Sequence, residues 1–170
     1  MKFKRSSVIL IASILPFVLG LTSGDLAPDF AVKNQDGKVV HMSDFSGKPV
    51  VMYFYPKDDT PGCTKEACSF RDEFTKFKKL GAVVLGVSRQ DEKSHQAFKA
   101  KHKLPFDLLV DGDGSLAKAY GVDSLMGLSI DARQSILIGA DGKVVKFYGK
   151  VDPKTHTEEV LKDLQGLAKK

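Results

Sequence analysis

The two cysteines of this 170-residue chain, Cys63 and Cys68, lie five residues apart. A thiolate is the nucleophilic form of cysteine, so the first thiol can attack an electrophile and the second can resolve the product. The pair follows the apolar run 50–55, which predicts a buried strand, and opens a segment with helical apolar spacing over 67–80. Cys63 is therefore expected at a helix N-terminus, where unpaired N–H groups and the helix dipole favour the thiolate.

The loop before Cys63 has residue types that suit a reactive thiol. Pro56 and Pro61 stiffen the approach, and Gly62 removes a side chain beside the sulfur. Thr60 lies three residues before Cys63. Its hydroxyl can hydrogen-bond the thiolate or a bound oxygen, or it can cap the helix. Residue spacing leaves both roles of Thr60 open.

Helix geometry restricts how Cys63 and Cys68 can bond. Residues five apart in an unbroken helix have Cα atoms about 8.6 Å apart, whereas disulfides rarely exceed about 7 Å. A bond between them requires the first turns to unwind, which favours a reversible bond over a permanent staple. A non-catalytic domain stapled by one disulfide remains an alternative.

Zinc is a second alternative, with His95 or His102 as further ligands. Structural zinc sites usually have tighter spacing and four clear ligands, so we expect neither a metal nor a cofactor here. The histidines all lie in polar stretches and are predicted to face solvent: His41, His95, His102 and His156.

Strand and helix patterns alternate along the rest of the chain. Helices are predicted at 64–80, 91–101, 115–120 and 157–168, and strands at 29–32, 39–42, 50–55, 82–87, 107–110, 135–138 and 143–148. Asp36-Gly37 indicates a hairpin between the first two strands. The order predicts one α/β domain over 24–170, with a mixed sheet covered by helices on both faces.

The N-terminus has the features of a targeting leader over 1–23. A basic start precedes an apolar run at 8–21, which contains Pro16 and is short for a membrane span. We expect export to the periplasm or outside, with no stable membrane association after cleavage; an uncleaved membrane anchor is the alternative. Without these residues, 23 basic and 21 acidic side chains give a net charge of +2, which predicts no nucleic-acid partner.

Several segments resemble the peroxiredoxin family, in particular the bacterioferritin-comigratory-protein or peroxiredoxin Q branch. The pattern P-x-x-x-T-x-x-C is present as Pro56, Thr60 and Cys63. Further matches are GCTKEACSFRD at 62–72, GDLAPDF at 24–30, and RQSILI at 133–138 followed by DGK at 141–143. The segment 123–132 departs from the branch pattern.

The resemblance implies a thioredoxin-like fold and a thiol-specific peroxidase acting on hydrogen peroxide and organic hydroperoxides. It implies that Cys63 becomes a sulfenic acid and that Cys68 condenses with it to a disulfide, which a thioredoxin-like donor reduces. It also assigns hydrogen bonds to the thiolate and peroxide from Thr60 and Arg133, and shielding of the sulfur by Pro56. This branch is often monomeric, so a monomer is expected.

An exported thiol-disulfide oxidoreductase is a rival function. Such exchange sites use a Cys-x-x-Cys spacing, which this chain lacks.

Overall fold

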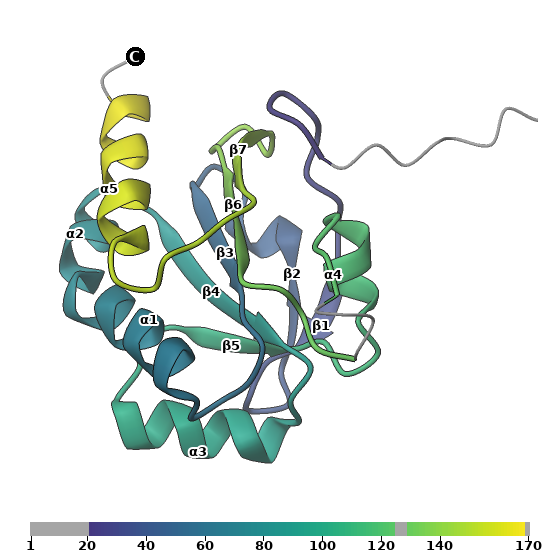
Figure 1. Cartoon of the computed structure of the whole chain (residues 1–170). Helices are drawn as coiled ribbons and strands as arrows, with labels where there is room; N and C mark the ends of the chain where they lie inside the picture. Colours follow the sequence, from purple (N-terminus) through teal and green to yellow (C-terminus); the bar gives the residue numbers. More distant parts are fainter. Residues whose placement is uncertain (1–20, 125–128, 169–170) are drawn as a thin grey trace, which may run out of the picture.

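The computed structural model describes residues 21–124 and 129–168 (Figure 1). The predicted leader lies outside these ranges except for its last three residues, and so does part of the segment 123–132. Within the described ranges, no helix is both long enough and apolar enough to cross a membrane.

Five strands form a central mixed sheet in the order β5-β4-β3-β6-β7. β3 pairs in parallel with β4, and β4 with β5, whereas β6 runs antiparallel to both β3 and β7. Every residue of the central strand β3 is buried, as expected for an apolar run covered on both faces. The bounds are Val50–Phe54 (β3), Val83–Ser88 (β4), Asp107–Val110 (β5), Gln134–Ile138 (β6) and Val144–Tyr148 (β7).

Two layers cover this sheet, and the side chains of β3 alternate between them. Val51 and Tyr53 belong to a core formed with α1, α2, α3 and α5, whereas Met52 and Phe54 belong to a second core formed with α4 and the N-terminal hairpin. Figure 1 shows α1, α2 and α5 on one side of the sheet and α4 on the other. The helices are Pro61–Asp72 (α1), Phe74–Lys79 (α2), Glu92–His102 (α3), Ser115–Ala119 (α4) and His156–Leu167 (α5).

The predicted hairpin is present as β1 (Ala31–Lys33) and β2 (Val39–His41), followed by the short 3-10 helix η1 (Met42–Phe45). It docks on the edge strand β5 through Gln35. The Gln35 backbone N–H donates to Leu108 O (3.0 Å), and Gln35 Oε1 accepts from Leu108 N–H (2.8 Å). The α/β fold with a mixed sheet, helices on both faces and an N-terminal hairpin is thus confirmed.

The helix predicted over 64–80 is divided in two, which corrects that prediction. It begins earlier, at Pro61, and breaks at Glu73. The break lets Phe74 pack near Phe106 (ring centroids 6.0 Å apart) while Phe77 stays against Phe70 (5.6 Å). A one-residue break preserves the three- and four-residue spacing of apolar side chains, so the sequence pattern did not reveal it.

Candidate active site

Cys63 occupies the third position of α1, as its place after a buried strand predicts. β3 ends at Phe54, and Thr60 precedes the helix with extended backbone angles. Pro61 takes the first helical position, where its missing N–H costs nothing because the first N–H groups of a helix have no partner. Cys63 is only 1% exposed. Its sulfur is therefore held in a mostly dry site at the positive end of a helix.

Arg133 contacts this sulfur directly. Its Nη2 donates a hydrogen bond to Cys63 Sγ at 3.1 Å. Phe54 pairs with Gln134 in the antiparallel register of β3 and β6, so the start of β6 lies beside the end of β3. Arg133 immediately precedes Gln134 and thereby comes next to the α1 N-terminus.

Gly62 has a further steric role that the sequence did not show. A Cβ atom on Gly62 would lie 3.1 Å from Arg133 Nη2, a tight contact that would require the guanidinium to shift. The absence of a side chain therefore lets Arg133 approach the Cys63 sulfur.

Glu66 is a site residue that the sequence analysis missed. Its side chain is fully buried and forms an ion pair with Arg133 through Nη1. Burial raises the pKa of Glu66 to about 7, although the positive charge of Arg133 acts in the opposite direction. Glu66 lies three residues after Cys63 and hence on the same helix face, next to the buried Ala67. Glu66 could have been identified from the sequence, because it places a carboxylate on an otherwise apolar helix face.

One guanidinium thus serves two acidic groups. Burial acts to lower the pKa of Arg133, but the charges of Glu66 and Cys63 overcome this effect and raise it. Arg133 therefore stays cationic and supplies a charge-assisted hydrogen bond to the sulfur.

Thr60 and Pro56 lie in the loop between β3 and α1. Thr60 occupies the capping position, but its side chain makes no bond to the helix start; its Oγ1 instead donates to Lys57 O at 3.0 Å. Its capping role is therefore not seen, and its hydroxyl oxygen keeps lone pairs that can accept a hydrogen bond. Pro56 is half-buried immediately after Tyr55, near the end of the strand.

Cys68 lies on the same unbroken helix as Cys63, and both are free thiols in the structure. Cys68 is half-buried, and its Sγ lies 3.9 Å from Nδ1 of His102 on α3. Ideal helix geometry puts the two Cα atoms about 8.6 Å apart, which exceeds disulfide reach. The two cysteines cannot bond in this conformation.

Two histidines predicted to face solvent are buried, which corrects the sequence analysis. His95 faces inward from α3 with Phe98, and its Nδ1 lies 2.8 Å from Asp58 Oδ2. His156 Nε2 lies 2.9 Å from Ser135 Oγ, and burial lowers the pKa of His156 to about 4. Most of their polar sequence neighbours lie on the outer helix faces, although Thr157 is buried beside His156.

The Asp58–His95 pair anchors the loop that leads to Cys63. Besides His95, Asp58 accepts hydrogen bonds from Tyr55 OH (2.7 Å) and Ser94 Oγ (2.7 Å). Burial acts to raise the pKa of Asp58, but these bonds, with that of His95 foremost, hold it below the ordinary value. The other ring nitrogen of His95, Nε2, lies 3.2 Å from Leu109 O. Both ring nitrogens of His95 thus face oxygen atoms, so the ring is held from two sides.

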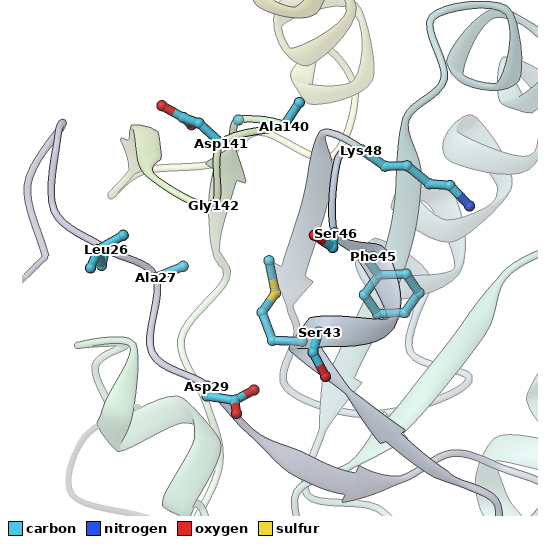
Figure 2. A pocket seen from close by; sticks show the side chains of 12 residues that line it. Leu26, Ala27, Asp29, Ser43, Phe45, Ser46, Lys48, Ala140, Asp141 and Gly142 are labelled. Atoms are coloured by element: carbon cyan, nitrogen blue, oxygen red, sulfur yellow. The ribbon is translucent and has the colours of Figure 1, made fainter.

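Other regions of the described structure offer less for catalysis. Among residues 21–124 and 129–168, no group of three or more His, Cys, Asp or Glu side chains could hold a metal ion. A groove of about 510 Å³ runs between Leu26, Phe45 and the 139–142 turn. Figure 2 shows Leu26 and Phe45 on opposite sides of it. Its lining includes no cysteine, histidine or arginine.

Comparisons with known proteins find similar sequences over most of the chain. The AhpC/TSA family model matches residues 23–147. The chain is 48% identical over 151 residues to a chloroplastic peroxiredoxin Q of Suaeda salsa, covering 88% of this chain and 71% of that protein. This chain belongs to the AhpC/TSA family. It is also 44% identical over 155 residues to peroxiredoxin Bcp of Bacillus subtilis, covering 86% of this chain and 97% of that protein.

Solved peroxiredoxin structures share the fold. Peroxidoxin BcpB of Mycobacterium tuberculosis is 32% identical with a TM-score of 0.81, over 86% of this chain and 98% of that one. A Xylella fastidiosa PrxQ mutant is 32% identical with a TM-score of 0.82, over 88% and 99% of the two chains. The expected resemblance to the peroxiredoxin Q and Bcp branch is confirmed. This peroxiredoxin is an oxidoreductase, a thiol peroxidase.

Proposed function

We propose that Cys63 reduces hydrogen peroxide and organic hydroperoxides, and that Cys68 resolves the product. The Cys63 thiolate attacks one peroxide oxygen, the O–O bond breaks, and the second oxygen leaves with a proton as water or alcohol. Cys63 becomes a sulfenic acid. The observation that carries the proposal is the hydrogen bond from Arg133 Nη2 to Cys63 Sγ, 3.1 Å long, at the N-terminus of α1.

Arg133 supplies charge stabilisation for this step. As the peroxide O–O bond breaks, negative charge moves from the sulfur toward the leaving oxygen, and a cation held beside the sulfur interacts with both. Glu66 holds the other edge of the guanidinium. We propose Glu66 as a positioning residue that keeps Arg133 oriented without touching the peroxide.

Thr60 and Pro56 complete the proposed site. While the Thr60 hydroxyl donates to Lys57 O, its oxygen can only accept, which suits the O–H group of a peroxide. Pro56 is proposed to shield the sulfur from bulk water.

Condensation then closes the catalytic cycle. The Cys68 sulfur attacks the Cys63 sulfenic sulfur, an S–S bond forms, the S–O bond breaks, and the oxygen leaves as water. The helix geometry described above supports a transient opening of α1 in this step. We propose a thioredoxin-like protein as the reductant of the disulfide, by analogy with the peroxiredoxin relatives.

Replacing each cysteine tests this assignment. The Cys63→Ser variant is expected to lose all peroxide consumption with a thioredoxin-type donor. The Cys68→Ser variant is expected to oxidise Cys63 once and then stop, with a sulfenic acid that a dimedone adduct reveals by mass spectrometry. Turnover at the wild-type rate in Cys63→Ser would overturn the peroxidatic role, and unimpaired recycling in Cys68→Ser would overturn the resolving role.

We also propose that residues 1–23 are a leader that is removed on export, leaving a monomeric domain over 24–170. The basic start and short apolar run support this proposal. The plant relative from Suaeda salsa is named as chloroplastic. N-terminal sequencing of protein from the native cell is expected to begin near Gly24. A chain beginning at Met1 in the membrane fraction would indicate an anchor instead.

A further inference from the structure

His102 touches two groups of the Pro56–Cys68 region from the far end of α3. Its Nε2 lies 2.9 Å from Asp59 Oδ1, and its Nδ1 lies 3.9 Å from Cys68 Sγ. One imidazole therefore bridges the loop that leads to Cys63 and the thiol proposed to resolve its sulfenic acid. From the sequence, His102 was predicted to face solvent, with zinc ligation as an alternative.

The contacts of the ring determine where its proton lies. Asp59 Oδ1 can only accept, so Nε2 of His102 carries the hydrogen in this contact. The hydrogen bond from His102, followed by that from Lys101, lowers the pKa of Asp59, which keeps the carboxylate ionised. In the neutral imidazole, Nδ1 then has a free lone pair, and this lone pair faces the Cys68 thiol. The order carboxylate, imidazole, thiol is the arrangement that activates cysteine and serine nucleophiles in hydrolases.

The backbone of Asp59 is adapted to this contact. Its φ is +57°, a left-handed conformation that few residues other than glycine adopt, although aspartate tolerates it better than most. This conformation presents the carboxylate to α3, where it also accepts from Lys101 Nζ at 3.0 Å.

We propose that His102, oriented by Asp59, is the general base for Cys68 in the resolving step. His102 Nδ1 takes the thiol proton, and the Cys68 sulfur then attacks the Cys63 sulfenic sulfur. The S–S bond forms, the S–O bond breaks, and the departing hydroxide takes up a proton and leaves as water. The oxidant is the peroxide that made the sulfenic acid. This inference rests on the proposed resolving role of Cys68.

Other groups around His102 set the electrostatic context. Arg71 on α1 donates from Nη1 to the His102 carbonyl oxygen at 2.8 Å. A hydrogen bond to Asp72, with a smaller contribution from Cys68, raises the pKa of Arg71. Arg71 therefore places positive charge beside Cys68, whereas Lys101 pairs with Asp59 at 3.0 Å.

A structural role of His102 is the competing explanation. Its ring packs edge-on against Phe98, with centroids 5.0 Å apart, and its side chain is 17% exposed. If His102 only fills space, its replacement would change the stability of α3. The reactivity of the Cys68 thiol would stay the same in variants that are folded to the same extent.

The first experiment measures Cys68 alone, in the Cys63→Ser background, where it is the single thiol. The rate of alkylation by iodoacetamide at pH 7 reports how readily Cys68 ionises. Adding His102→Gln is expected to slow alkylation by about tenfold, less than a fully sequestered general base provides because the site is partly exposed. Above about pH 9 the difference is expected to vanish, since hydroxide then ionises an ordinary thiol unaided.

Two neighbouring substitutions serve as controls. Lys101→Gln removes the other partner of Asp59 and leaves the His102 ring in place, so a change of less than about twofold in alkylation is expected for this exposed pair. Asp59→Asn keeps a residue that tolerates the positive φ but weakens the orientation of the ring, and an intermediate effect is expected. Equal alkylation rates with and without the His102→Gln substitution would overturn the proposal, as would a loss that persists at high pH.

The second experiment uses both cysteines and peroxide. In rapid-quench mass spectrometry, His102→Gln is expected to leave sulfenic acid formation on Cys63 unchanged and to slow disulfide formation by about the same tenfold factor. More sulfinic acid would then accumulate at high peroxide. If the wild-type chain forms no Cys63–Cys68 disulfide, the proposed function fails, while the alkylation result still decides the His102–Cys68 coupling.

Discussion

Arg133 Nη2 lies 3.1 Å from Cys63 Sγ, although the two residues are 70 positions apart in the chain. The antiparallel pairing of β3 and β6 creates this contact. The same guanidinium is paired with the fully buried Glu66 on the helix that carries Cys63. The reactive sulfur, its cation and the counter-charge therefore form one unit whose parts can be changed separately.

Adding a methyl group at Gly62 tests the approach of Arg133 without removing the charge. In Gly62→Ala the new Cβ would lie 3.1 Å from Nη2, so the guanidinium must shift. We expect single-turnover oxidation of Cys63 by peroxide to slow by about tenfold, less than the 10²–10³-fold typical when an anion-stabilising donor is deleted. In Arg133→Met the oxidation rate is expected to fall by about the full 10²–10³-fold, because the donor itself is removed.

Gly166→Ala is the matched control. Gly166 also lies in a helix, but a Cβ there meets nothing within 4 Å. This variant is expected to keep the wild-type oxidation rate and to gain about 0.5–1 kcal/mol of stability from helix propensity. Wild-type oxidation in Gly62→Ala would show that the position of Arg133 does not limit the reaction.

The free energy of unfolding is expected to depend on pH through Glu66 and His156, which act in opposite directions. Glu66 has its folded pKa raised from 4.5 to about 7, so its contribution is fully present below pH 4.5 and is lost as the pH rises to 7. His156 has its folded pKa lowered from 6.5 to about 4, so its contribution is present above pH 6.5 and is lost as the pH falls to 4. Each contribution amounts to about 3 kcal/mol.

Urea unfolding between pH 4.5 and 7 checks this balance. In Glu66→Gln the histidine contribution is left alone, and the free energy of unfolding should rise with pH by about 3 kcal/mol relative to wild type. In His156→Gln the opposite slope is expected. Carboxylates with lowered pKa values, such as Asp58, change the free energy of unfolding only at pH values below this range. Parallel pH curves for wild type and Glu66→Gln would contradict the prediction.

Breaking the Asp58–His95 pair should destabilise the protein strongly. The side chains are 5% and 0% exposed, so His95→Gln leaves a buried carboxylate without one of its hydrogen-bond partners. We expect a loss of about 2–3 kcal/mol in the free energy of unfolding at pH 7. His41→Gln changes an exposed histidine of β2 and should alter stability by less than about 0.5 kcal/mol. Similar losses in the two variants would refute a special role for the pair.

Oxidation to the disulfide should unwind part of α1. The helix spans Pro61–Asp72 and holds the two thiols out of bonding reach. One equivalent of peroxide is expected to reduce the helical circular dichroism signal by about one to two turns, and a thiol reductant should restore it. Cys68→Ser should keep its helical signal under the same treatment. An unchanged signal in a chain shown by mass spectrometry to carry the disulfide would disprove the opening.

Much of the secondary structure could be predicted from local patterns. The apolar run at 50–55 indicated the buried β3, and Asp36-Gly37 indicated the hairpin, because strand burial and turn geometry depend on a few adjacent residues. The break at Glu73 escaped prediction because packing of Phe74 against Phe106, a contact distant in sequence, determines it.

Two features of the site follow from residues that are close together along the helix. These features are the place of Cys63 in the first turn of α1 and a separation from Cys68 that forbids a disulfide in the closed helix. Both follow from backbone periodicity, which acts over a few residues.

The groups that contact these thiols from distant parts of the chain depend on the packing of the whole fold. Arg133 reaches Cys63 through sheet register, and His102 reaches Cys68 through the packing of α3 on α1. The fold also buries Glu66 beside Arg133 and His95 beside Asp58, contacts that residue types alone do not indicate. Strand register and the choice of buried helix face arise from the cooperative packing of the whole core. A pattern of neighbouring residues therefore does not predict which distant side chains come into contact.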